Sequence, residues 1–109
     1  MTVREIAETL HLEPLSVSDD ARDVTGAYVG DLLSWVMGRA KSGDLWITIM
    51  SNINIVAVAS LTDVACIVLA EGVTLEDNVR VTAEQKGVNI FTSEKTAYEL
   101  AADLASLSK

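Results

Sequence analysis

Two nearly continuous apolar runs, residues 45–50 and residues 65–70, dominate the hydrophobic pattern of this chain. Short apolar runs without alternation are typical of strands buried on both faces, as in a parallel sheet. About fourteen residues separate the runs, which is enough for one helix crossing between parallel strands. The alanines in this segment favour the helix, and Ser51 or Asn52 is its expected N-cap. A strand is the alternative, because several residues of the segment are β-branched.

Apolar positions at helical spacing predict further helices on both sides of this centre. A capping box of Thr2 and Glu5 begins the first helix, which should run to about residue 12. Asp31 is the expected cap of the second helix, and Trp35 widens its apolar face. The expected extended segments are residues 15–17, as a short edge strand, and residues 24–29 and 88–91.

Two more helices are expected in the second half of the chain. Thr74 and Asp77 resemble a capping pattern for one of them, and Gly87 suits its left-handed end. Thr92 or Ser93 is the expected cap of the last helix. The alternation of strands and helices predicts an α/β fold in a single domain, residues 1–109, with a mostly parallel central sheet of about four strands and flanking helices.

The crossover helix is apolar nearly all round, and a small domain has few ways to cover such a helix. We therefore expect a homodimer in which a second subunit packs on it. The candidate interface residues are Ile53, Ile55, Val56 and Ala59.

Residues 45–62 carry no charge and approach the length of a membrane span. A transmembrane helix is disfavoured because Ser51, Asn52 and Asn54 lie near its centre and no Lys or Arg cluster flanks it. The formal net charge of -8 disfavours nucleic acid and anionic membrane as partners. The N-terminus carries acidic residues and does not resemble a signal peptide. The single cysteine, Cys66, lies inside an expected strand, and both observations indicate a cytoplasmic protein.

Catalytic motifs are missing from the sequence. It has no Gly-rich phosphate loop ending in Lys-Ser/Thr, no GxGxxG, no paired cysteines and one histidine, His11. We expect no enzyme, no catalytic residue, no metal and no cofactor. An enzyme using Asp31 or Glu71 with Thr25 is kept as a minor alternative.

Ligands of open parallel α/β sheets bind beyond the carboxyl ends of the strands, where helix N-termini and their amides converge. Helix capping is the competing explanation for Ser51, Asn52 and Ser93. The candidate ligand residues at these strand ends are Ser51, Asn52, Asn54, Glu71, Thr92 and Ser93.

The run DVTGAYVGDLL, residues 23–33, is followed by Gly43 and Asp44 entering a strand and by a terminal block of helix, Gly87 turn, strand and helix. This order resembles the DRTGG domain family from about Val3 onward. The family's naming motif falls on residues 23–27, where Val24 replaces Arg and Ala27 replaces the second Gly. Because polar and glycine residues group there, four residues of this run are also candidates for the ligand site: Asp23, Thr25, Gly26 and Gly30.

The resemblance implies a fold similar to the N-terminal domain of HPr kinase and a role as a regulatory or dimerising module. Such domains lie between CBS domains of some pyrophosphatases and beside the catalytic part of some phosphotransacetylases. The leading hypothesis is therefore a bacterial, non-catalytic homodimer that senses a nucleotide or small metabolite. The alternative is a protein-interaction or assembly factor for a redox enzyme of the hydrogenase type.

Overall fold

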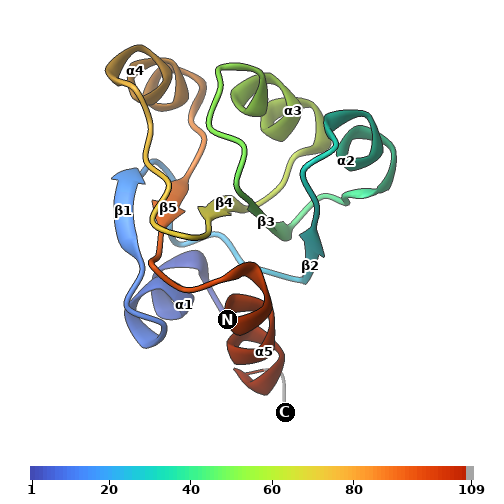
Figure 1. Cartoon of the computed structure of the whole chain (residues 1–109), viewed down its shortest axis with the longest axis vertical. Helices are drawn as coiled ribbons and strands as arrows, with labels where there is room; N and C mark the ends of the chain where they lie inside the picture. The colour runs from blue at the N-terminus through green and yellow to red at the C-terminus, as the bar shows by residue number, and fades with distance from the viewer. Residues whose placement is uncertain (108–109) are drawn as a thin grey trace.

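A computed structural model of the chain describes residues 1–107, which form one sheet with helices on both faces (Figure 1). The chain begins with α1 (Val3–Thr9), β1 (Glu13–Ser16) and β2 (Gly26–Val29). The middle comprises α2 (Leu33–Arg39), β3 (Asp44–Thr48), α3 (Asn54–Thr62) and β4 (Cys66–Leu69). The remaining elements are α4 (Asp77–Lys86), β5 (Ile90–Thr92) and α5 (Ala97–Leu107).

The sheet confirms the α/β fold and its mostly parallel character. Its order is β1-β5-β4-β3-β2, and β2 through β5 are parallel neighbours. The fifth strand is β1, which pairs antiparallel with β5 at one edge. Every residue of β3, β4 and β5 is buried, as the nearly continuous apolar runs predict for β3 and β4. At the other edge, β2 is largely exposed.

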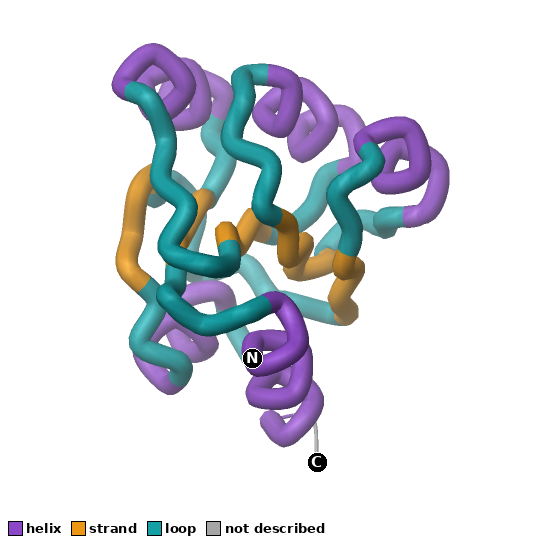
Figure 2. The backbone as a smooth tube through the Cα atoms, viewed as in Figure 1, coloured by secondary structure: helices purple, strands orange, loops and turns teal. Residues whose placement is uncertain are grey.

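Helices lie on both faces of the sheet (Figure 2), and one apolar layer on each face holds them there. Residues of α2, α3 and α4 pack on one face around Trp46, and residues of α1 and α5 pack on the other around Leu45 and Ile47. Trp46 is fully buried and donates its indole N–H to the Gly30 carbonyl at 2.9 Å. The capping box of Thr2 and Glu5 is present, although α1 ends at Thr9 rather than near residue 12.

The crossover between β3 and β4 is the helix α3, so residues 45–62 form a strand and a helix within the sheet layers. Ile55, Val56 and Ala59 are at most 3% exposed in the core, because α2 and α4 flank α3 on both sides. These three residues are therefore not available as an interface, and of the four candidates only Ile53 is exposed. No helix within residues 1–107 has the length and apolar character needed to cross a membrane.

Several predicted caps were wrong. α4 begins after Glu76 without a side-chain cap bond. Asn52 is the exception, because its Oδ1 accepts from the Asn54 N–H at the start of α3, although Ile53 lies between the two residues. The last helix starts at Ala97 rather than after Ser93, and Thr96 and Glu99 exchange the bonds of its capping box. The predicted burial of Trp35 was also wrong: it is 53% exposed, with the Arg39 guanidinium 3.8 Å from its ring centroid.

Candidate ligand-binding site

The structure divides the candidate ligand residues between the two ends of the sheet. Gly30 follows β2, and Ser51, Asn52 and Asn54 follow β3. Glu71 and Ser93 come after β4 and β5, and Thr92 is the last residue of β5. Since these four strands are parallel, all seven residues lie toward the carboxyl end of the strands.

The motif residues Asp23, Thr25 and Gly26 lie at the amino end of the strands, because they precede or begin β2. A strand advances about 3.3 Å per residue, so the length of β2 separates Gly26 from Gly30. The motif and the strand ends are therefore not parts of one compact site within a single subunit.

The loops after β4 and β5 bind each other through their backbones. Glu71 donates its N–H to the Lys95 carbonyl at 2.8 Å, and Gly72 donates to the Ser93 carbonyl at 2.8 Å. Ser93 in turn donates to the Leu69 carbonyl at 3.0 Å. These three amides already have partners within the protein, so they are not available to a ligand.

A pocket of about 340 Å³ opens beside these two loops. Thr92 and Ser93 line it, and the Thr92 hydroxyl donates to the Val73 carbonyl at 2.6 Å. Lys95 also lines the pocket, and its ammonium pairs with Asp103, which raises the pKa of Lys95 through the hydrogen bond and the charge. The remaining lining residues are Leu10, His11, Glu13, Gly72, Thr74 and Glu94.

The ends of β2 and β3 are connected by Asp31 rather than left open. Its Oδ1 accepts from the Thr48 hydroxyl at 2.8 Å and from the Ile49 N–H at 3.0 Å. Asp31 therefore does not cap α2, whose N-cap position is Leu32. Asn52 accepts from the Asn54 N–H at 2.9 Å, which turns the chain into α3.

The motif residues shape the contact between β2 and β3. A β-carbon at Gly26 would lie 2.6 Å from the Asp44 carboxylate, so the glycine leaves room for this side chain where it stands. Gly43 has φ +87° and lies against the Thr25 side chain, which leaves no room for a β-carbon there either. Lys41 donates its N–H to the same Asp44 carboxylate at 2.8 Å. Thr25 and Gly26 thus have packing roles that do not require a ligand.

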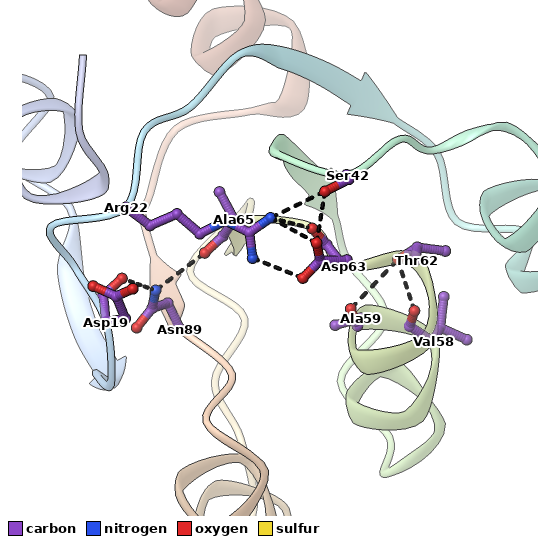
Figure 3. A network of polar contacts seen from close by, with 9 residues as sticks. All are labelled: Asp19, Arg22, Ser42, Val58, Ala59, Thr62, Asp63, Ala65 and Asn89. Atoms are coloured by element: carbon purple, nitrogen blue, oxygen red, sulfur yellow. Dashed lines mark hydrogen bonds and ion pairs between the residues drawn. The ribbon is translucent and has the colours of Figure 1, made fainter.

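A polar network beside the motif includes residues that the sequence analysis missed (Figure 3). Arg22 donates to both carboxylate oxygens of Asp63, at 2.9 and 3.0 Å, and to the Asp63 carbonyl at 2.7 Å. Asn89 is 4% exposed and donates to the carbonyls of Asp19 and Ala65. Arg22 immediately precedes the motif, but its partner is 41 residues away and carries no local signal.

The family follows from comparison with known proteins. A model of the DRTGG domain matches residues 5–107. The chain belongs to the DRTGG domain family. A comparison with curated proteins finds no match.

One similar solved structure contains the CBS and DRTGG domains of the regulatory region of Clostridium perfringens pyrophosphatase, complexed with its activator, diadenosine tetraphosphate. The TM-score is 0.73 at 15% identity, and the match covers 93% of the present chain. It covers 44% of the pyrophosphatase chain, so our chain spans less than half of that structure. The likeness shows that the two share the fold.

Proposed function

We propose that this DRTGG domain is a non-catalytic, cytoplasmic regulatory module that works as a homodimer and binds a nucleotide or small metabolite. The binding site is the pocket at the carboxyl ends of β4 and β5. The observation that carries the proposal is the position of this pocket, lined by Thr92, Ser93 and Lys95 at the strand ends where α/β sheets bind ligands. The likeness to a regulatory region crystallised with a dinucleotide supports the ligand class.

The side chains of this pocket suit a ligand with both anionic and hydroxyl groups. The Lys95 ammonium provides a positive charge, and Ser93 and Thr74 provide hydroxyls that donate or accept. The carboxylates of Glu13 and Glu94 accept hydrogen bonds from sugar hydroxyls or amino groups. Leu10 adds an apolar surface for a base or an alkyl group.

The placement of the minor enzyme candidates supports a non-catalytic role. Asp31 and Thr25 lie at opposite ends of β2, and the Asp31 carboxylate already accepts two hydrogen bonds. Glu71 stands after β4, and β3 lies between β4 and β2 in the sheet. These residues do not form one acid-base constellation.

Thermal denaturation with a panel of nucleotides and central metabolites tests the proposal. A ligand at about a hundred times its dissociation constant adds about 2.7 kcal/mol to stability, which raises the melting temperature of a domain of this size by roughly 10–20 °C. Lys95→Gln should reduce the shift given by an anionic ligand, whereas Lys86→Gln on α4 should leave it unchanged. The absence of any shift across the panel would contradict the proposal.

An assembly factor for a redox enzyme is the second candidate, and exposed apolar side chains favour it. Leu32, Trp35 and Met37, in or next to α2, are 42 to 59% exposed, and Ile49 and Ile53 are 47% and 43% exposed. Exposed apolar residues gathered in one region are typical of protein-binding surfaces. Copurification from the native host should then yield one defined partner that Trp35→Lys releases. A homodimer without partners would contradict this second candidate.

A further inference from the structure

The two edges of the sheet differ in how they are protected against pairing with another strand. On β1, Glu13 places a charge and Pro14 removes a backbone donor, and the register with β5 shifts between Pro14 and Ser16. Charge, proline and irregular pairing are the usual devices that keep an edge strand from joining another sheet. The β1 edge is therefore blocked.

The β2 edge has none of these devices. Its sequence, Gly26-Ala27-Tyr28-Val29, contains no charge and no proline, and it pairs regularly with β3 alone. In Figure 1, β2 is the last strand of the row. An uncharged, regular edge strand is a template for a further strand.

Neighbouring hydrogen bonds show which backbone groups of β2 point outward. Thr25 donates inward to the Gly43 carbonyl, and Val24 donates outward to the Met1 carbonyl, each within 3.0 Å. Because backbone direction alternates along a strand, the N–H and C=O groups of Gly26 and Tyr28 point away from β3. The bridge between Thr2 and Asp23 covers the edge just before β2, so the open edge begins at Gly26.

An apolar groove of about 280 Å³ adjoins this edge on the face that carries α1 and α5. Ala27 and Val29 form one wall, and Ala101 and Leu104 of α5 form the other. Val29 is 50% exposed. No charged side chain is among the groove's lining residues. The open edge and the groove make one surface without charged side chains.

We propose that β2 pairs antiparallel with β2 of a second copy, so that the two sheets join across a twofold axis. This inference rests on the homodimer of the proposed function and names its interface. Within that homodimer the β2 edge is the contact because each chain has a net charge of -8, and two such chains approach with least repulsion where neither carries a charged side chain. An edge strand paired with itself is also self-complementary, as a twofold interface must be.

The covered part of the edge selects the register of this pairing. Twofold antiparallel pairing is centred on one residue that faces its own counterpart. A pair centred on Ala27 would set Gly30 of each copy opposite Val24 of the other, whose outward N–H already bonds the Met1 carbonyl. A pair centred on Tyr28 sets Asp31 opposite Thr25 and Ala27 opposite Val29. The interface is therefore centred on Tyr28.

Sedimentation velocity on three versions of the full chain tests the surface. The wild type should sediment as a dimer, and Val29→Lys as a species of half that mass, because a charge on the open edge blocks pairing. Val81→Lys on α4 is the matched control, since Val81 is 46% exposed against 50% for Val29, and it should remain a dimer. Circular dichroism should show the same fold for all three proteins.

Single cysteines test the register independently. Residues that face each other in a hydrogen-bonded antiparallel pair have Cα atoms about 5.5 Å apart, within disulfide range. Under oxidation Tyr28→Cys should give a covalent dimer, whereas Ala27→Cys should not, because it lies diagonal to its counterpart. Crosslinking through Ala27→Cys instead would overturn the Tyr28-centred register.

The outcomes separate this surface from the proposed function. A wild-type dimer that Val29→Lys leaves intact overturns the β2 interface and leaves the homodimer standing. A monomeric wild type overturns the β2 interface and the homodimer together. Binding of an apolar dye to the groove of such a monomer would mean that the groove serves a small ligand instead. Nucleotide binding is measured separately, by the thermal shift of the Val29→Lys variant, and its absence in every variant counts against the proposed function alone.

Discussion

Arg22 binds the end of α3, because its guanidinium donates to both carboxylate oxygens and to the backbone carbonyl of Asp63. Asp63 is the left-handed C-cap of α3, with φ 62°, a conformation that costs most residues about 1–2 kcal/mol and that aspartate tolerates better than most. The pair thus connects the chain just before the motif to the crossover helix and to the Ser42 hydroxyl.

The ion pair of Arg22 and Asp63 predicts that the stability of the fold depends on pH. The hydrogen bonds from Arg22 and Ser42 lower the pKa of the Asp63 carboxyl below its ordinary value. A carboxyl with a lowered folded-state pKa stabilises the fold above its unfolded value of about 3.9, and the contribution is lost as pH falls further. Asp63→Asn should therefore cost less than about 1 kcal/mol near pH 7, since the carboxylate is exposed, and the difference should vanish toward pH 2. Urea unfolding at several pH values measures it, with Asp19→Asn as the control.

The contact between Thr25 and Gly43 predicts opposite effects of alanine at two glycines. Gly43→Ala should destabilise the fold by about 2 kcal/mol or more, because φ is +87° and the new β-carbon overlaps the Thr25 side chain. Gly38→Ala lies inside α2 with nothing within 4 Å and should stabilise it by about 0.5–1 kcal/mol. Equal effects in chemical denaturation would refute the packing role of the motif turn.

The burial of α3 within one subunit predicts a contrast between two isoleucines. Ile55 is fully buried, so Ile55→Ala should cost about 2–5 kcal/mol in chemical denaturation. Ile53 is 43% exposed, and Ile53→Ala should change stability by no more than about 0.5 kcal/mol. A larger loss at Ile53 than at Ile55 would mean that the exposed end of the helix, and not its core face, is the part covered in solution.

Burial of Cys66 predicts an unreactive thiol. Desolvation raises the pKa of Cys66 to about 12, so almost no thiolate exists at neutral pH. A thiol reagent such as dithionitrobenzoate should modify the native protein only at the rate at which it unfolds. In denaturant it should titrate one thiol per chain at once. Rapid modification of the folded protein would show that β4 is accessible.

Elements whose signal lies within a few consecutive residues were predicted correctly in most cases. The unbroken apolar runs of β3 and β4 indicated strands buried on both faces, and the capping box of Thr2 and Glu5 was visible in four residues. The box of Thr96 and Glu99 was equally visible but was missed, because Thr92 and Ser93 offered earlier caps. Backbone bonds from the loop after β4 hold residues 93 and 95 outside the helix.

The candidate site was predicted less well, for two physical reasons. Strand direction alone places Thr25 before β2 and Gly30 after it, so one site containing both was incompatible with the predicted strand. Ile55, Val56 and Ala59 are not an interface because α2 and α4 bury them within the subunit. The prediction considered the apolar surface of α3 alone and not the helices that pack beside it. The partnership of Arg22 and Asp63 joins residues far apart in sequence and has no local signature.

Nuclear magnetic resonance titration of the labelled domain with the nucleotide or metabolite that gives the largest thermal shift tests the central claim most directly. If the pocket at the ends of β4 and β5 binds the ligand, the largest amide shifts should fall at Gly72, Thr74 and residues 92–95. Shifts concentrated on residues 23–27, or no shifts at a ligand excess that saturates ordinary micromolar sites, would contradict it.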